Sequence, residues 1–283
     1  MKKILVPTDF SSCAENAMNF AIQSTKVFPV EVVLLHAFEI NGNMYTDYMG
    51  VNREFNETLL NEEVERLETY KKNIAEKDSV DVTTFFFKGT FKDAIEQVKA
   101  EHDIRLIVMG TRGVGFLTEK LWGNKTAALI SSSDIPVLAV PLEYTWKKPQ
   151  KMLVSTNNFE EKSTILDFIF DLAALYVAQV YVAVFTDEED DKTAIYIEHN
   201  RQLPAYEKML REKYNEKTLV GVNLIGKQFE KTLQDYIDKN GIDILVMITY
   251  QRSFWDKLFQ PSQTEKMSYH STIPLLAIPA KEG

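Results

Sequence analysis

The sequence repeats itself once, and this repeat limits the possible folds more than any other feature. Residues 3–9, KILVPTD, return as residues 151–157, KMLVSTN, at an offset of 148 (151 − 3). Two later segments return at an offset of 138, residues 107–111 as 245–249 and residues 135–141 as 273–279. Two copies of one fold therefore follow each other along the chain. The polar, proline-bearing residues 143–150 join them, so we predict domains at residues 1–143 and 149–283.

Length and composition agree with two soluble domains. The 283 residues fit one large or two ordinary domains of about 100–200 residues. The formal net charge of −9 argues against a general nucleic-acid binder or an anionic-membrane binder. Cys13 is the only cysteine, which excludes an intramolecular disulfide and a thiolate metal cluster. The sequence has no apolar run of about 18–20 residues and no signal-peptide pattern, so we expect a cytoplasmic protein.

In both copies, short β-branched runs alternate with longer helical patterns, which predicts the α/β class. Strands are predicted at residues 4–7, 31–37, 82–87, 106–109 and 137–140, and again at 153–155, 179–184, 220–225, 244–247 and 275–278. Helices are predicted at residues 14–27, 55–76, 92–101 and 125–131, and again at 161–176, 204–214, 230–239 and 264–270. The alternation predicts two tandem copies of a doubly wound, Rossmann-like, five-stranded parallel sheet with strand order 3-2-1-4-5.

Doubly wound sheets bind ligands where the winding reverses, here between the first and fourth strands of each copy. In the first copy this crevice lies between Asp9 and a glycine-rich segment that begins at Gly110. Glycines let backbone N–H groups approach phosphate oxygens, and a helix that begins after Gly123 offers unpaired N–H groups to the same anion. The segment matches neither the phosphate-loop pattern nor the dinucleotide fingerprint.

The pattern resembles the universal stress protein family in its tandem form, and the resemblance covers both halves. ATP-binding members of that family carry G-2x-G-9x-G-[ST] after the fourth strand, and Gly110, Gly113 and Gly123 match this spacing. Asn124 stands where the family has a hydroxyl residue, and it keeps a hydrogen-bonding side chain. The resemblance implies an adenine nucleotide alpha hydrolase-like fold that binds ATP or another adenine nucleotide, with Mg²⁺ as a possible companion and with weak or absent hydrolysis.

The resemblance also assigns further residues to the nucleotide. It puts Asp9 at the adenosine end, Ala37 beside the adenine and Met109 just before the glycines. The predicted nucleotide-binding residues are Pro7, Thr8, Asp9, Ala37, Met109, Gly110, Arg112, Gly113, Gly123, Asn124 and Lys125.

Each of these residues also has a purely structural interpretation. The glycines could form turns and Asp9 could cap the following helix, but the matching spacing favours ligand contact. Arg112 and Lys120 would be natural phosphate counter-charges, although charges in exposed segments are more often solvated. An aromatic patch of Tyr45, Tyr48 and Met49 could cover an adenine or pack on the domain.

The second copy lacks most of these predicted nucleotide-binding residues. Ile248, Gln251 and Pro261 replace the three glycines, Asn157 replaces Asp9, and an acidic run at residues 187–191 would repel phosphate. We therefore expect a poor ATP site there. The last strand of each copy would be an exposed apolar edge, which favours pairing of the two copies as an internal pseudo-dimer. A homodimer of whole chains stays open.

No catalytic constellation is recognisable. The four histidines lack zinc spacing, Cys13 fits a buried structural thiol, and Glu62 and Glu63 fit surface charge. We predict no catalytic residue and no metal ligand. The leading hypothesis is a stress-response protein that binds adenine nucleotide in its first domain as a sensor. The alternatives are a nucleotide-free interaction scaffold and a slow Mg²⁺-dependent ATPase.

Overall fold

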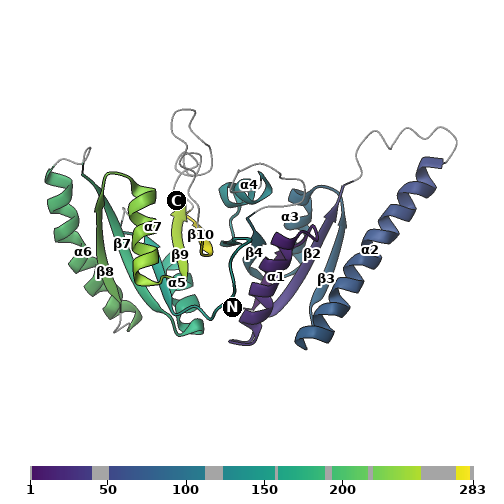
Figure 1. The fold of residues 1–283 in the computed structure, drawn as a ribbon, viewed down its shortest axis with the longest axis horizontal. Helices are drawn as coiled ribbons and strands as arrows, with labels where there is room; N and C mark the ends of the chain where they lie inside the picture. Colours follow the sequence, from purple (N-terminus) through teal and green to yellow (C-terminus); the bar gives the residue numbers. More distant parts are fainter. Residues whose placement is uncertain are drawn as a thin grey trace.

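The computed structural model describes residues 2–39, 51–111, 124–156, 159–188, 193–215, 219–249 and 272–280. In the first half, strands and helices alternate as β1 (Lys3–Pro7), α1 (Ser12–Thr25), β2 (Glu31–Phe38), α2 (Val51–Asp78), β3 (Thr83–Lys88), α3 (Phe91–Glu101), β4 (Ile104–Gly110), α4 (Asn124–Ser132) and β5 (Val137–Val140). The second half continues as β6 (Lys151–Ser155), α5 (Ser163–Tyr176), β7 (Gln179–Asp187), α6 (Thr193–Tyr214), β8 (Val220–Gly226), α7 (Phe229–Asn240), β9 (Ile244–Thr249) and β10 (Leu275–Pro279). Figure 1 shows the two halves side by side.

The strands form one ten-stranded sheet in the order β3-β2-β1-β4-β5-β10-β9-β6-β7-β8. Within each half the pairs are parallel, so the predicted order 3-2-1-4-5 is confirmed twice. At the centre, β5 and β10 pair antiparallel, with Leu138 opposite Leu276. Each of these strands is the last of its own half, as expected, and each covers the edge of the other.

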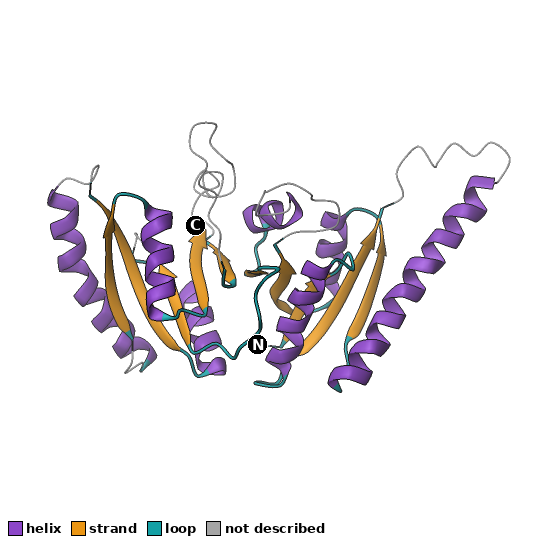
Figure 2. Cartoon of the chain, in the orientation of Figure 1, coloured by secondary structure: helices purple, strands orange, loops and turns teal. Residues whose placement is uncertain are grey.

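Helices cover both faces of the sheet (Figure 2). The core on one face contains buried residues of α1, α2, α5 and α6, and the core on the other face contains residues of α3, α4 and α7. The strands supply both cores by alternation, since Ile4 and Val6 face the first core and Leu5 faces the second. The near-continuous apolar runs of the sequence therefore correspond to strands that are buried on both sides.

Within the described residues each predicted element is present, and the differences are in the ends of helices and strands, with the largest at the start of α6. α6 begins at Thr193 and runs through Pro204, where the sequence predicted its first residue. A proline lacks the N–H that would bond the carbonyl four residues earlier. That carbonyl belongs to Asn200, which is exposed, so water can satisfy it. The helix predicted at residues 264–270 lies outside the described residues. In the described part of the chain, no helix is both long and apolar enough to cross a membrane.

Candidate functional site

The sheet order brings the ends of β1 and β4 together in the first domain. These neighbouring strands are paired in parallel, with Leu5 opposite Ile107. β1 connects to β2 on one side of this point, and β4 connects to β5 on the other. The winding therefore reverses between β1 and β4, which is where open α/β sheets form their ligand crevice.

The residues after β1 form a tight turn that starts α1. The Thr8 N–H donates to the Leu35 carbonyl (2.8 Å), and the Thr8 hydroxyl accepts from the Phe10 N–H (3.0 Å). Asp9 Oδ1 accepts from both the Ser11 N–H (3.1 Å) and the Ser11 hydroxyl (2.6 Å). Ser11 is the N-cap of α1, and its hydroxyl accepts from the Ala14 N–H. Asp9 is therefore not the cap. Asp9 is half-buried, and the bonds from Ser11 hold its carboxylate beyond the end of β1.

Gly110 ends β4 where the strand touches α1. A Cβ built on Gly110 would lie 2.6 Å from the Cys13 carbonyl oxygen and 2.7 Å from the Cys13 Sγ. Cys13 is buried, as expected, and its thiol lies 3.7 Å from the Thr111 hydroxyl. The absence of a side chain at Gly110 thus lets α1 pack closely on β4. The sequence analysis related this glycine to the approach of phosphate and did not predict its packing role.

Thr126, in the first turn of α4, ties that helix to the crevice. Its hydroxyl is buried and donates to the Gly110 carbonyl (2.8 Å). The neighbouring Lys125 is exposed, and its ammonium lies 5.7 Å from the Phe91 ring centroid. The start of α4 therefore lies next to the end of β4, with a cation beside it.

Of the other predicted residues, Pro7 ends β1, and Ala37 lies half-buried near the end of β2. Met109 is buried just before Gly110. The structure thus brings the β1, β2 and β4 ends of the predicted site together. The remaining candidates lie outside the described residues, namely Arg112, Gly113, Lys120, Gly123, the side chain of Asn124, Tyr45, Tyr48 and Met49.

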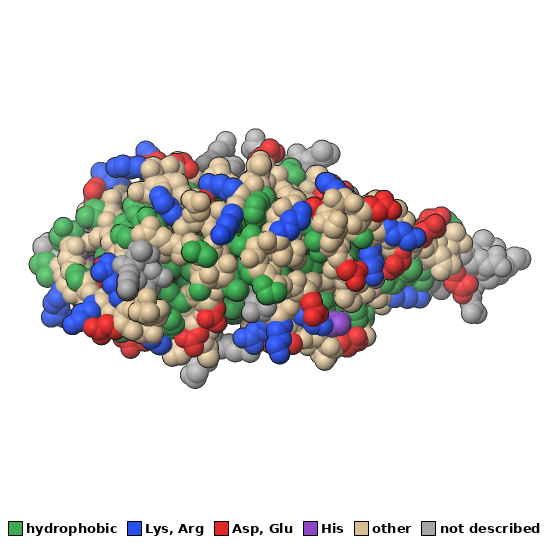
Figure 3. All heavy atoms as spheres, turned by 90° about the horizontal axis from the view of Figure 1, so that it is seen from below, with side chains coloured by type: hydrophobic (Ala, Val, Ile, Leu, Met, Phe, Trp, Pro, Cys, Tyr) green, Lys and Arg blue, Asp and Glu red, His purple; other side chains and the backbone are tan. Residues whose placement is uncertain are grey.

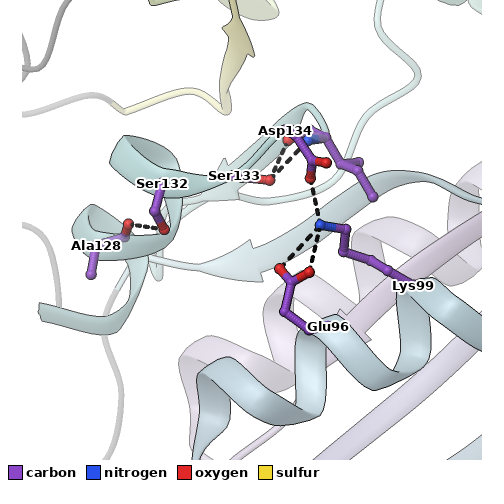
Figure 4. Close-up of polar contacts among 7 residues, drawn as sticks. Glu96, Lys99, Ala128, Ser132, Ser133 and Asp134 are labelled. Carbon is purple, nitrogen blue, oxygen red and sulfur yellow. Dashed lines mark hydrogen bonds and ion pairs between the residues drawn. The ribbon is translucent and has the colours of Figure 1, made fainter.

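A cation clamp holds the far end of α4. Lys99 of α3 lies 2.6 Å from Asp134, which follows α4, and 3.0 Å from Glu96 one turn earlier on α3 (Figure 4). Burial lowers the pKa of Lys99, but the bonds to Asp134 and Glu96 outweigh burial and raise it overall. Because Thr126 fixes one end of α4 and this clamp the other, the helix that faces the crevice is anchored at both ends.

His36, near the end of β2, is the residue that sequence reasoning missed. Its ring is buried between Phe10, at 4.6 Å between centroids, and Phe86, at 5.9 Å. Phe10 adopts a left-handed conformation with φ of 58°, and the guanidinium of Arg66 lies 4.2 Å above its ring. The turn after β1 is therefore packed against α2 through the Phe10 ring and the Arg66 guanidinium.

Both ring nitrogens of His36 face oxygen acceptors. Nδ1 lies 2.8 Å from the Thr8 carbonyl, and Nε2 lies 3.2 Å from Glu63 Oε2, at ion-pair distance without hydrogen-bond alignment. A carbonyl can only accept, so the contact with Thr8 assigns a proton to Nδ1. The expectation that Glu63 is surface charge was wrong, because its side chain is only 23% exposed and pairs with His36. The topology brings them together from 27 residues apart (63 − 36).

The matching crevice of the second domain is filled by larger side chains. At the offset of 148, Phe185 corresponds to Ala37, and it is buried against Phe229 at 5.2 Å between ring centroids. At the offset of 138, Ile248 corresponds to Gly110 and is buried in the core. The space that the resemblance assigns to adenine in the first domain is therefore occupied by a phenyl ring in the second.

Two hollows of about 630 and 640 Å³ are present outside the predicted crevice. None of the predicted site residues lines either of them. Within the described part of the chain, no group of three or more His, Cys, Asp or Glu residues could hold a metal ion. The face of the molecule in Figure 3 carries basic and acidic side chains interspersed, without a broad basic surface.

Both halves match one family of known proteins. The model described as "Universal stress protein family" matches residues 1–141 and 149–279. Universal stress protein MJ0531 of Methanocaldococcus jannaschii is 31% identical over 150 residues, covering 53% of this chain and 84% of the relative. Universal stress protein MJ0577 of the same organism is 31% identical over 153 residues, covering 49% and 94%. Each of these relatives thus corresponds to about one half of this chain.

Solved structures with the same fold span both halves. The crystal structure of a universal stress protein from Archaeoglobus fulgidus DSM 4304 has a TM-score of 0.69 at 14% identity, covering 98% of both chains. A putative universal stress protein from Pseudomonas aeruginosa UCBPP-PA14 has a TM-score of 0.56 at 13% identity, covering 98% of this chain and 92% of that one. At such low identity these two likenesses establish the fold.

Proposed function

This chain belongs to the universal stress protein family as a tandem member, and from this premise we propose that it is a stress-response protein whose first domain binds an adenine nucleotide. Binding, rather than hydrolysis, is the proposed activity, with occupancy shifting the population of conformations or partners. A cytoplasmic location is part of the proposal. The observation that carries it is the meeting of Asp9, Ala37 and the start of α4 at the reversal point between β1 and β4.

The chemistry of these groups fits an adenine nucleotide. The Asp9 carboxylate is an acceptor for the hydroxyl and amino donors of adenosine. The small side chain of Ala37 leaves room for a flat base where the second domain has Phe185. The N-terminal N–H groups of α4 and the Lys125 ammonium provide positive charge for phosphates. A nucleotide-bound Mg²⁺ would further neutralise the phosphate oxygens.

The two domains differ in this proposal. We infer that the first domain carries the nucleotide and that the second serves as its covalent partner in a pseudo-dimer joined at β5 and β10. Covalent linkage raises the effective concentration of one domain for the other. Phe185 and Ile248 in the second crevice support this division, because they fill space that a nucleotide would need.

The test is a titration of the full chain with ATP, AMP and cAMP, together with analysis of nucleotide that remains bound after purification. We expect Asp9→Ala to weaken binding by about 10-fold to 100-fold, because hydrogen bonds to charged groups contribute about 1.5–3 kcal/mol. The repeat provides a matched control, since Asn157→Ala changes the corresponding position of the second domain. Gly113→Val tests the glycine segment separately.

The outcomes separate the possible functions. Loss of binding in Asp9→Ala, with Asn157→Ala unchanged, supports a nucleotide site in the first domain. The reverse pattern would transfer the site to the second domain. If the wild-type chain binds none of the three nucleotides at millimolar concentration, the proposal is wrong and an interaction scaffold remains.

A further inference from the structure

The linker between the domains lies in a groove to which both domains contribute. This first groove lies between α1 and the start of β9. The Asn16 side-chain amide donates to the carbonyls of Pro141 (2.7 Å), Leu142 (3.2 Å) and Tyr144 (2.9 Å), which fixes the linker backbone. The ring of Tyr144 is buried and lies 6.1 Å from the Phe20 ring, between centroids. A short peptide that begins with a turn at residues 142–143, closed by the bond from the Tyr144 N–H to the Pro141 carbonyl (3.1 Å), thus docks in the first groove through one aromatic side chain.

A charge pair completes this docking. The Lys147 ammonium, three residues after Tyr144, lies 2.6 Å from the buried carboxylate of Asp243. The other carboxylate oxygen of Asp243 accepts from the N–H groups of Gln150 and Lys151, at 2.8 and 2.9 Å. The linker is therefore held through two of its own side chains, an aromatic one and a cation three residues later.

The repeat predicts a second groove at the corresponding place, with the two domains exchanged, and the structure contains a hollow there. It is a hollow of about 640 Å³ between α5 and the starts of β4 and β5. At the offset of 148, Asn16 and Phe20 correspond to Thr164 and Phe168, and both of these line the hollow. At the offset of 138, Asp243 corresponds to Arg105, which also lines it.

Like the first groove, the second has an apolar base, but it carries a positive charge at Arg105 where the first carries a negative charge at Asp243. Phe168 replaces Phe20 as the aromatic platform, and exposed Arg105 replaces the acid that binds Lys147. Among the acids of the groove, Asp134 is paired with Lys99 (2.6 Å), and Asp167 accepts from the Tyr214 hydroxyl (2.6 Å). Asp171 and Lys162 also line the groove, and they are of opposite sign.

We propose that the second groove is a docking site for a short peptide segment of a partner protein, carrying an aromatic side chain and, three residues later, an acidic side chain. The aromatic ring would pack on Phe168 as Tyr144 packs on Phe20. The acid would pair with Arg105, in place of the Lys147–Asp243 pair. The chain's own linker thus serves as the template for the partner, with one charge reversed. This surface is distinct from the proposed nucleotide crevice and does not depend on it.

The test uses two peptides that copy residues 142–148 of this chain, one unmodified and one with Lys147→Glu. Each is titrated into the full chain, and binding is followed by NMR of isoleucine methyl groups, since Ile135, Ile165 and Ile278 line the second groove. We expect the Lys147→Glu peptide to shift these methyl signals and to bind about threefold to tenfold more tightly than the unmodified copy. This range follows from replacing repulsion by attraction at one exposed charge pair.

Variants of the full chain locate the interaction. Arg105→Asp should invert the preference between the two peptides, because it restores the charge found at Asp243. Phe168→Ala should weaken the binding of both peptides. Arg201→Asp, an exposed charge reversal on α6 outside the groove, is the matched control and should leave the preference unchanged.

Other results would overturn the proposal. One is that neither peptide shifts the three methyl signals at millimolar concentration, and another is that the preference survives Arg105→Asp. If a chain that ends at Ala280 binds the Lys147→Glu peptide at least about tenfold more tightly than the full chain, residues 281–283 are the natural occupant. If Arg105→Asp changes the sedimentation of the chain, the occupant is a second copy.

Discussion

At the scale of single residues, the crevice depends on groups that contact the ends of strands rather than on the motif alone. His36 lies between the Thr8 carbonyl and Glu63, and the Phe10 ring packs at a tilt against the His36 ring. Gly110 lets α1 approach β4 at a distance that a methyl group would prevent. These contacts set the positions of Thr8, Asp9 and Gly110, which the sequence already marks as candidates.

The first prediction concerns the His36–Glu63 pair. Glu63→Ala should lower the free energy of unfolding by about 1–3 kcal/mol, because it leaves a buried imidazole nitrogen without its acidic partner. Glu62→Ala is the matched control on the same helix. Its side chain is exposed, so the change should stay within about 0.5 kcal/mol. Urea denaturation of the three proteins measures both effects, and equal losses in the two variants would refute a role for the pair.

The second prediction concerns Gly110. Gly110→Ala should destabilise the fold by about 1–3 kcal/mol, because the added methyl group meets the backbone of Cys13, which cannot move without shifting α1. Gly221→Ala is the comparison, since its Cβ would meet the flexible Glu207 carboxylate and should cost less. Thermal unfolding monitored by circular dichroism tests the order. A smaller loss in Gly110→Ala than in Gly221→Ala would contradict the packing role.

At the scale of elements, α4 is the helix that completes the crevice, and two contacts hold it. Thr126 bonds the Gly110 carbonyl at its start, and Lys99 of α3 clamps Asp134 beyond its end. Both contacts join α4 to neighbouring elements rather than to its own turns. The placement of its N-terminal N–H groups therefore depends on tertiary structure.

The third prediction tests this anchoring. Thr126→Val removes the bond to the Gly110 carbonyl and keeps the side-chain shape, so the free energy of unfolding should fall by about 1–2 kcal/mol. Ser132→Ala on the same helix removes only a local bond to the Ala128 carbonyl and should cost less (Figure 4). If the nucleotide site is as proposed, ATP affinity should fall in Thr126→Val and not in Ser132→Ala. A calorimetric titration of both variants decides this.

At the scale of the whole molecule, the two domains share one sheet and a set of buried phenols. The Tyr176 hydroxyl of α5 lies 2.7 Å from the Ser24 hydroxyl of α1, and the Tyr176 ring packs edge-on against Phe28. Tyr144 of the linker is buried against Phe20. Burial raises the pKa of Tyr144 to about 12, with a further contribution from the charge of Asp243, and burial also raises the pKa of Tyr176.

The fourth prediction is a loss of stability in alkali. Well below pH 10 these phenols are neutral in both the folded and the unfolded chain, so the free energy of unfolding does not depend on their ionisation. As the pH rises from about 10 to about 12, the unfolded chain ionises first, and stability falls by up to about 1.4 kcal/mol per pH unit for each buried phenol. Tyr144→Phe should reduce this slope. Tyr196→Phe, which changes an exposed tyrosine, controls for loss of a hydroxyl, and an equal slope in wild type and Tyr144→Phe would disprove the assignment.

The sequence by itself determined the repeat, the α/β class and the strand order within each half, and it predicted the place of a crevice between β1 and β4. These follow from local hydrophobic patterns and from the handedness of crossovers, which need no knowledge of distant contacts. Asp9 and Gly110 were predicted as site residues for a related reason, because each lies just after a predicted strand.

Only the tertiary structure decided which distant side chains meet. Glu63 reaches His36, Cys13 fills the place of a Gly110 side chain, and β10 covers the edge of β5. Local patterns carry no information about such pairs. Helix α2 exposes most of its charged residues, and nothing in the sequence around Glu63 distinguishes it from them. The two grooves show the same limit. Their charges oppose each other at Asp243 and Arg105, and the importance of that difference appears only when the linker is seen docked in one of them.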